Sequence, residues 1–205
     1  MTSPSVAEQR RYRGTPAEAR RAQRREQLLQ AAIEVYGEKG YRHATVKAVC
    51  EAAGLTERYF YESFANSEEL LIAAFHTVAD RLLEELARGV AEVPGGPLER
   101  TRALLTAYYG ALRTQPRSAR VFLVEISGVS PAVNQALVAS LRTFGELLTR
   151  TMDPHGQGGA STQPLLRTGV VGGVLHIALR WISEGYTQPI HEVVEAALGL
   201  CRVLG

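Results

Sequence analysis

The segment from Thr45 to Phe64, TVKAVCEAAGLTERYFYESF, constrains the fold of this chain more than any other feature. Thr45 is a favourable cap for a short helix, because its hydroxyl accepts a backbone N–H at the helix start. Four apolar residues then follow at the spacing of one helix face: Val46, Val49, Cys50 and Ala53. Gly54 supplies the left-handed backbone of a sharp turn, and Thr56 is placed to cap a second helix. The segment therefore predicts a helix-turn-helix unit.

The second short helix, expected at 57–64, has two different faces. At about 100° per residue, Phe60 and Phe64 point together toward the core. The other side points into solvent: Arg58, Tyr59, Tyr61 and Glu62. Two exposed tyrosines are poorly explained by stability, whereas a phenol can pack on a thymine methyl and donate to a phosphate. We therefore expect this face to meet DNA.

Three charged residues on this helix have different expected partners. Arg58 suits a guanine or a phosphate. Glu57 and Glu62 repel phosphates, so we expect them to contact base amino groups, to pair with arginines, or to lie off the path of the DNA backbone.

The basic charge of the chain is concentrated near its start. The formal net charge is only +2, yet seven arginines and one acid, Glu18, lie between Arg10 and Arg25. Such a segment is typical of a protein that binds a polyanion, although a solvated, partly frayed arm explains it equally well. Residues 1–15 carry little apolar content, and we expect a flexible basic arm there.

The rest of the chain is expected to be helical, with no strand alternation and no repeat. A helix is expected from Pro16 to the stop signal at Gly40, and PGGP at 94–97 is a firm break. Further helices are expected at 46–53, 57–64, 67–90, 98–114, 117–127, 131–152, 164–185 and 189–203, with a loop at 153–164. The predicted fold is all-α, with about nine helices.

Composition excludes several classes of protein. With 45% hydrophobic and 21% charged residues, the chain can bury a core. Its two cysteines, Cys50 and Cys201, lie far apart and suggest neither a disulfide framework nor a metal site. No signal peptide is visible, and the apolar stretch from Gly169 to Ile182 is too short to span a bilayer. We expect a cytoplasmic protein with no cofactor, no metal and no membrane contact.

The segment from about Arg24 to Leu71 resembles the N-terminal domain of the TetR family of bacterial transcriptional regulators. The resemblance covers about a quarter of the chain and rests on an ordered set of short matches: the Leu29–Ala31–Ala32 region, Tyr36, Gly40, Thr45-Val46, Ala53-Gly54-Leu55-Thr56, Tyr61, Phe64 and Asn66-Ser67-Glu68-Glu69-Leu70-Leu71. It implies a DNA-binding domain over residues 16–66 and a helical effector-binding and dimerisation domain over 67–205.

The resemblance also implies which residues contact DNA. They are Thr45, Val46 and Lys47 of the first short helix and Thr56, Glu57, Arg58, Tyr59 and Tyr61 of the second. To these we add Arg20, Arg21 and Arg24 from the basic segment. Ser67 stands where members often have a lysine and Ser63 where a histidine is common, while Arg58 and Tyr59 stand where small residues are usual. The operator sequence therefore does not follow by analogy.

The C-terminal helices are expected to form a core and a subunit interface. Asn66 and Glu69 resemble a capping box that opens a long helix. The stretch 165–182 is apolar on nearly every side and should be buried on nearly every side. Its glycines, Gly169, Gly172 and Gly173, indicate close helix approach, with a phosphate loop as the weaker alternative. By family analogy, the last two helices form a four-helix bundle across a two-fold axis.

A ligand cavity is expected among the intervening helices. The candidate lining residues are Phe75, Tyr108, Phe122, Glu125, Phe144, His176 and Trp181, although core packing explains each one alone as well. Glu125 lies in an apolar stretch and needs a partner, which can be Arg180 or a neighbouring arginine rather than a ligand. His176 is more typical of a satisfied core histidine.

Together these patterns favour a DNA-binding transcriptional regulator, a homodimer released from a palindromic operator by a small, largely apolar effector. Repression is preferred to activation, because blocking a promoter needs no polymerase contact. A ligand-independent DNA-organising protein is the first alternative. An all-α enzyme is weaker, because no His-Glu-x-x-His or Gly-x-Ser-x-Gly motif is present.

Overall fold

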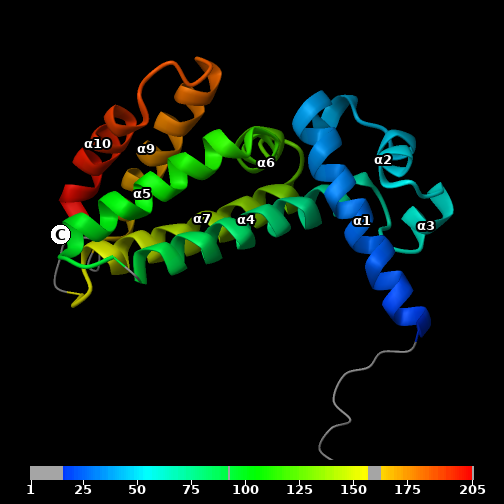
Figure 1. The fold of residues 1–205 in the computed structure, drawn as a ribbon, viewed down its shortest axis with the longest axis horizontal. Helices are drawn as coiled ribbons and strands as arrows, with labels where there is room; N and C mark the ends of the chain where they lie inside the picture. Colours follow the sequence, from blue (N-terminus) through cyan, green and yellow to red (C-terminus); the bar gives the residue numbers. More distant parts are fainter. Residues whose placement is uncertain (1–15, 92, 157–162, 205) are drawn as a thin grey trace, which may run out of the picture.

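A computed structural model describes residues 16–91, 93–156 and 163–204 of the chain (Figure 1). Every regular element within these ranges is helical. The elements are α1 (Pro16–Lys39), η1 (Tyr41–His43), α2 (Val46–Ala53), α3 (Glu57–Tyr61), α4 (Ser67–Ala91), α5 (Pro97–Thr114), α6 (Pro116–Arg120), η2 (Val121–Glu125), α7 (Pro131–Met152), α9 (Pro164–Ser183), α10 (Ile190–Cys201) and η3 (Arg202–Leu204). The all-α prediction is confirmed. The expected arm at 1–15 lies outside the described residues.

Helices α1, α2 and α3 form a compact unit at one end of the molecule (Figure 1). Helix α1 buries one face, which includes Leu28, Ala32 and Tyr36, and α2 packs against it. The long helix α4 then leads away toward the other helices. Its start is capped as expected: Asn66 Oδ1 accepts from the Glu69 N–H at 2.9 Å, and the Glu69 carboxylate accepts from the Ala65 N–H at 2.7 Å.

The C-terminal helices surround a second part of the core. Helix α5 packs on α4, α7 and α10, and its Tyr108 and Tyr109 are fully buried. The Tyr109 hydroxyl donates to the backbone oxygen of Val174 in α9 at 3.0 Å, and the Trp181 indole N–H donates to the Gln188 oxygen at 2.9 Å. The first bond is buried and holds α9 to α5, and the second joins α9 to the loop that follows it.

The two halves of the molecule meet where α6 and η2 lie against α1. A Cβ added at Gly37 of α1 would lie 2.5 Å from the Arg117 Cβ and 2.6 Å from its Cα, so only glycine permits this approach. Arg117 also pairs with Glu34, with an N–O distance of 2.5 Å. The C-terminal half therefore contacts the helix-turn-helix unit directly.

Glu125 of η2 makes a further link between the two halves. Its carboxylate accepts from the Tyr41 N–H at 2.7 Å and from Arg120 Nε at 2.8 Å. The partner of this half-buried acid is thus a neighbouring arginine, one of the expected possibilities, and is not Arg180. Ser130 reaches α4 as well, donating to the Glu68 carboxylate at 2.9 Å.

Helix ends differ from the sequence expectation most clearly in two places. Helix α3 ends at Tyr61, three residues before the expected Phe64. The helix expected at 117–127 is the short α6 continued by a π-helical turn that ends at Glu125. Helix ends depend on tertiary contacts as well as on local sequence, so they are predicted less well than helix starts.

Candidate DNA interface and ligand pocket

The helix-turn-helix is held by its caps and by its turn. Thr45 Oγ1 accepts from the Ala48 N–H at 3.1 Å, which confirms the expected cap of α2. Gly54 has φ +66°, and the next N–H, that of Leu55, bonds back to the Cys50 oxygen at 2.9 Å. Thr56 has the extended backbone of a cap, but its side chain makes no capping hydrogen bond. Its hydroxyl is exposed beside the start of α3.

Two phenylalanines anchor α3 to the core. Phe60 and Phe64 are buried, with ring centroids 5.9 Å apart. Burial also raises the pKa of the Cys50 thiol beneath the turn, with a smaller contribution from Glu57. A five-residue helix is not stable by itself, so these contacts fix which way its other side faces.

The opposite side of α3 and the start of α2 are open to solvent. The Tyr61 residue is 60% exposed, and the Arg58 side chain 84%. Thr45, Lys47, Thr56 and Glu57 are also exposed, whereas Val46 is half-buried. Lys47 pairs with Glu51 only across exposed surface, at 3.8 Å. These side chains are free to meet a duplex.

The tyrosines of α3 differ from each other. Tyr59, expected to be fully exposed, is half-buried because the Arg24 guanidinium stacks on its ring, 4.3 Å from the centroid. Glu62 was also expected to face solvent, but it pairs with Arg24 at 3.6 Å and with Arg58 at 3.2 Å. Arginine pairing was one of the three expected roles of this acid.

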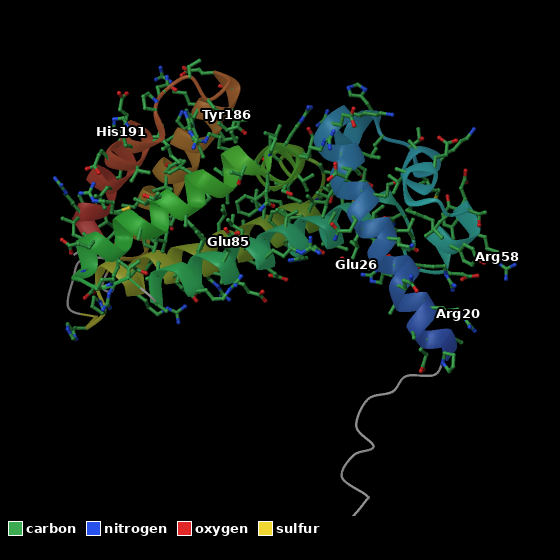
Figure 2. All side chains as sticks on the ribbon, viewed as in Figure 1. Arg20, Glu26, Arg58, Glu85, Tyr186 and His191 are labelled. Atoms are coloured by element: carbon green, nitrogen blue, oxygen red, sulfur yellow. The ribbon has the colours of Figure 1, made fainter. Side chains whose placement is uncertain are left out.

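Some arginines of α1 bond to other residues of the subunit, and others are exposed to solvent. Arg21 donates to the backbone oxygen of Glu62 at 2.5 Å. Arg25 donates to the backbone oxygen of Ser63 at 3.1 Å, and its guanidinium lies over the Phe64 ring. With Arg24, they hold the end of α3 against α1. Arg20 is exposed at the start of α1 (Figure 2).

Sequence reasoning missed Arg25 and Arg42. Arg25 belongs to the basic segment but was not chosen. Arg42 is exposed in η1, three residues before the cap of α2. In the sequence, the position of Arg42 just before a capped helix was the signal that could have identified it.

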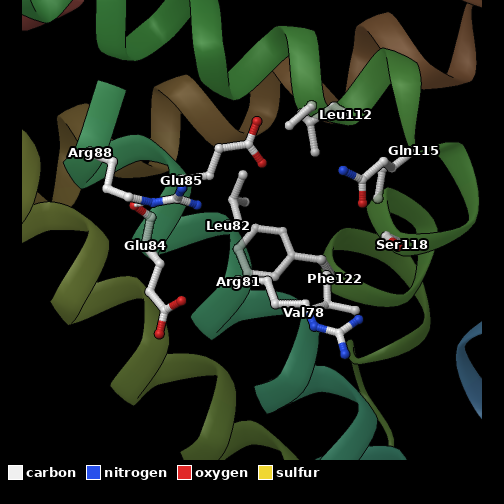
Figure 3. Close-up of a pocket in the computed structure, with 12 residues that line it drawn as sticks. Val78, Arg81, Leu82, Glu84, Glu85, Arg88, Leu112, Gln115, Ser118 and Phe122 are labelled. Atoms are coloured by element: carbon white, nitrogen blue, oxygen red, sulfur yellow. Dashed lines mark hydrogen bonds between the residues drawn. The ribbon is translucent and has the colours of Figure 1, made fainter. Parts of the chain in front are cut away.

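A pocket of about 240 Å³ lies in the C-terminal half, between α4, α5 and the α6–η2 segment (Figure 3). Its apolar lining includes Val78, Leu82, Leu112, Ala119 and Phe122. Its polar lining is Arg81, Glu84, Glu85, Arg88, Gln115 and Ser118. The pocket thus combines an apolar wall with polar groups that could orient a small molecule.

The expected ligand residues are not brought together at this pocket. Phe122 lines it, and Phe75 stacks beside Phe122, with ring centroids 5.6 Å apart and planes 8° apart. Tyr108, Phe144 and Trp181 are buried in the core and do not line it. His176 was expected in the core, but it is exposed on α9 in a shallow groove with Leu179 and Arg180.

Tyr108 has an unusual environment for a polar side chain. Its hydroxyl is buried without a hydrogen-bond partner among the described residues. Burial raises its pKa well above the usual value, and Tyr109 adds to the shift. The neutral phenol is therefore the stable form in this core.

Sequence reasoning also missed Glu85, Arg88 and Gln115. The charged residues of α4 look like a solvated helix face in sequence, and only the approach of α5 makes that face the wall of a pocket.

The outer face of α9 is open in the single subunit, contrary to the expectation of burial on nearly every side. Leu165 is 86% exposed, and Gly169, Gly172 and His176 continue the exposed stripe. The glycines face different neighbours: a Cβ at Gly173 would lie 2.7 Å from the Leu200 Cδ1 of α10, whereas Gly169 and Gly172 have open space. Close helix approach is thus present at Gly173 only.

Helix α9 is also long and apolar enough to cross a membrane, judged by length and composition alone. The expectation that this stretch is too short was made on Gly169–Ile182, whereas the helix runs from Pro164 to Ser183. A core helix of a globular protein meets the same test, and α9 packs on α7 and α10. Among the described residues, no group of three or more metal-ligating side chains occurs.

Comparisons with known proteins agree with the helix-turn-helix geometry. The family model described as "Bacterial regulatory proteins, tetR family" matches residues 28–74. The HTH-type transcriptional regulator TcmR of Streptomyces glaucescens is 28% identical over 137 residues, 65% of this chain and 56% of that protein. The HTH-type transcriptional repressor KstR2 of Mycobacterium tuberculosis is 30% identical over 89 residues, 43% of this chain and 44% of that protein. The chain thus spans about half the length of these curated relatives.

Solved structures share the whole fold. The fatty acid degradation regulator FadR of Bacillus halodurans has a TM-score of 0.75 at 20% identity, with 95% of this chain and 97% of that chain covered. FadR of Bacillus subtilis, in complex with stearoyl-CoA, has a TM-score of 0.73 at 19% identity, with 86% and 96% covered. At such identities the likeness establishes the fold.

Proposed function

This chain belongs to the TetR family of bacterial regulatory proteins, and from that premise we propose that it is a cytoplasmic repressor which binds operator DNA as a homodimer. A small molecule in the pocket between α4, α5 and α6 would lower its affinity for DNA. Residues 16–66 would form the DNA-binding domain, and residues 67–205 the effector-binding and dimerisation domain.

The observation that carries this proposal is the free outer side of α3. Phe60 and Phe64 hold the helix from within, so Tyr61 and Arg58 project outward. A tyrosine there can pack on a thymine methyl or donate to a phosphate, and an arginine can read a guanine. Helix α2 approaches a duplex with its N-terminus, where backbone N–H groups and Lys47 favour a phosphate.

A homodimer would use the open faces of α9 and α10. The exposed residues of the single subunit include Leu165 and Gly172 on α9, Leu200 on α10 and Val203 on η3. An apolar surface of this kind is typical of a subunit interface. Two recognition helices about 34 Å apart would then meet successive major grooves of a palindromic site.

The pocket and the DNA-binding unit share one segment of the chain. Ser118, Ala119 and Phe122 line the pocket. Arg117 and Glu125 of the same segment contact α1 and η1. A ligand that shifts α6 and η2 would thus shift the helix-turn-helix, and binding to one site would oppose binding to the other.

The pocket also favours a ligand-responsive regulator over a DNA-organising protein that needs no cavity. The complex of Bacillus subtilis FadR with stearoyl-CoA shows that a protein of the same fold holds a small molecule. Repression is proposed because it requires only that the dimer occupy a promoter.

Selection of genomic DNA fragments by the purified protein tests the proposal. We expect enrichment of a few fragments that share a palindrome, followed by nanomolar binding of that palindrome in fluorescence anisotropy. Metabolites related to the neighbouring genes should then weaken this binding. Enrichment of fragments without a common sequence would contradict the proposal and favour the DNA-organising alternative.

A further inference from the structure

The pocket between α4, α5 and α6 has one wall suited to a flat apolar group. Phe122 forms this wall with Leu82 and Leu112, and the Phe75 ring supports it from behind at 5.6 Å. Because Phe75 is fully buried and nearly parallel to Phe122, the Phe122 ring is held in one orientation. A ligand ring can pack against its free face.

The charged residues around the pocket are not equivalent. Arg81 is occupied by α1, where it bonds to Glu26 at 3.1 Å and to Gln30 at 3.4 Å. Arg88 donates from Nε to the backbone oxygen of Glu84 in its own helix at 3.4 Å. Neither guanidinium forms an ion pair with the pocket's own carboxylates in the part of the chain that the structure describes.

Glu85 and Glu84 differ in the direction of their carboxylates. Neither carboxylate has a hydrogen bond or ion pair within the described residues. Figure 3 shows the Glu85 carboxylate directed across the pocket toward α5, above Leu82 and the Phe122 ring, whereas the Glu84 carboxylate points away. Glu85 is exposed, so its carboxylate lies at the open side of the pocket, where a positive group on a bound ligand can pair with it.

From this arrangement we infer that the pocket takes a small amphipathic organic cation, whose ammonium group pairs with Glu85 while its apolar part packs on Leu82 and Phe122. The inference rests on the proposed function, because it assigns the chemical class of the effector. Arg81 is paired to Glu26 and the Glu84 carboxylate points away, so Glu85 is the carboxylate that faces the pocket. An anionic ligand packed on Leu82 and Phe122 would bring its charge near the Glu85 carboxylate, and like charges repel.

The size of the pocket limits the apolar part of the ligand. Its volume of about 240 Å³ is below the range of roughly 300–1,000 Å³ that is typical of drug-sized ligands. A cavity of about 150 Å³ in another protein holds benzene. One aromatic ring with a short alkylammonium chain therefore matches the space.

Isothermal titration calorimetry of the full chain at neutral pH tests the inference with three probes. The probes share a phenyl ring and a short alkyl chain and differ in charge: 4-phenylbutylammonium, 4-phenylbutan-1-ol and 5-phenylpentanoate. We expect the ammonium probe to bind severalfold tighter than the alcohol, with the carboxylate weakest. Glu85→Gln should remove this advantage and leave the alcohol unchanged.

Glu84→Gln is the matched control, because it removes a neighbouring carboxylate that points away from the pocket. It should leave the binding of all three probes as in the wild type. The inference is overturned if the carboxylate binds best, if the ammonium probe does not bind, or if the two variants lose ammonium binding equally. Thermal melting of both variants verifies that they remain folded.

Binding and DNA release are measured separately so that the two proposals can fail separately. The ammonium probe could bind in a way that depends on Glu85 and yet leave operator affinity unchanged. That result would contradict the effector role of the pocket but support an organic cation as its ligand. If another class of molecule released operator DNA and the ammonium probe did not bind, the inference of a cationic ligand would be wrong. The proposal of a ligand-responsive regulator would still stand.

Discussion

At the scale of single residues, the arginines of α1 form contacts within the subunit in addition to giving it positive charge. Arg24 stacks on Tyr59 and pairs with Glu62, and Arg21 and Arg25 bond to the carbonyl groups that follow α3. Cations are favourable at a helix C-terminus. Arg24, which the sequence assigned to DNA contact, is therefore better placed to position α3 than to meet a phosphate.

Replacing Arg24 by glutamine separates these two roles. We expect Arg24→Gln to weaken operator binding severalfold, because α3 loses its support, while the slope of log K against log salt concentration stays unchanged. Lys47→Gln is the comparison and should reduce that slope by about 0.9, as loss of one phosphate contact does. Fluorescence anisotropy over a range of salt concentrations measures both slopes. An equal reduction in the two variants would show that Arg24 contacts phosphate.

At the scale of helices, the junction between α1 and α6 depends on one missing side chain. Gly37 allows the Arg117 backbone to approach, and Glu125 holds η2 to the start of η1. These contacts join the pocket segment to the DNA-binding unit. The junction is therefore the element through which a ligand would act on DNA binding.

Gly37→Ala should disturb this junction. The added methyl group would lie 2.6 Å from backbone, so we expect α6 to move and the free energy of unfolding to fall by about 1–3 kcal/mol. Gly110→Ala in α5 is the matched control, because no atom lies within 4 Å of its added Cβ. In that control the free energy of unfolding should rise by up to about 1 kcal/mol, because alanine favours a helix more than glycine does. Equal urea midpoints for the two variants would contradict the close contact.

Local sequence signals predicted the helix starts well. Thr45, Ser67 after its Asn66 cap, and Pro131 each mark an observed start, because capping is decided within a few residues. The junction at Gly37 was not predicted, since Arg117 lies far along the chain. Glu85 was missed for the same reason: its neighbours across the pocket come from α5 and η2.

At the scale of the whole molecule, α9 is more apolar than a single subunit requires. Its sequence predicted burial all round, but Leu165 and Gly172 are open in the subunit. An apolar sequence pattern predicts which residues are buried in the functional assembly. A second subunit would bury the face of α9 that is exposed in the single subunit.

Gly172→Arg should block the approach of a second subunit. Because Gly172 faces open space in the subunit, we expect the variant to fold but to sediment as a monomer of 22.3 kDa. The wild type should have twice that mass. Gly89→Arg, at another helical glycine with open space, is the control and should remain dimeric. A dimeric Gly172→Arg variant would place the interface elsewhere.

The central claim is that the outer side of α3 reads duplex DNA, and operator binding by Tyr61→Ala measures it most directly. Tyr61 is exposed, so its loss should leave folding intact and reduce affinity for the selected palindrome on the order of tenfold. Thr106→Ala, an exposed change on α5, should bind as the wild type does. Wild-type affinity in the Tyr61→Ala protein, together with unchanged sequence preference, would contradict the account.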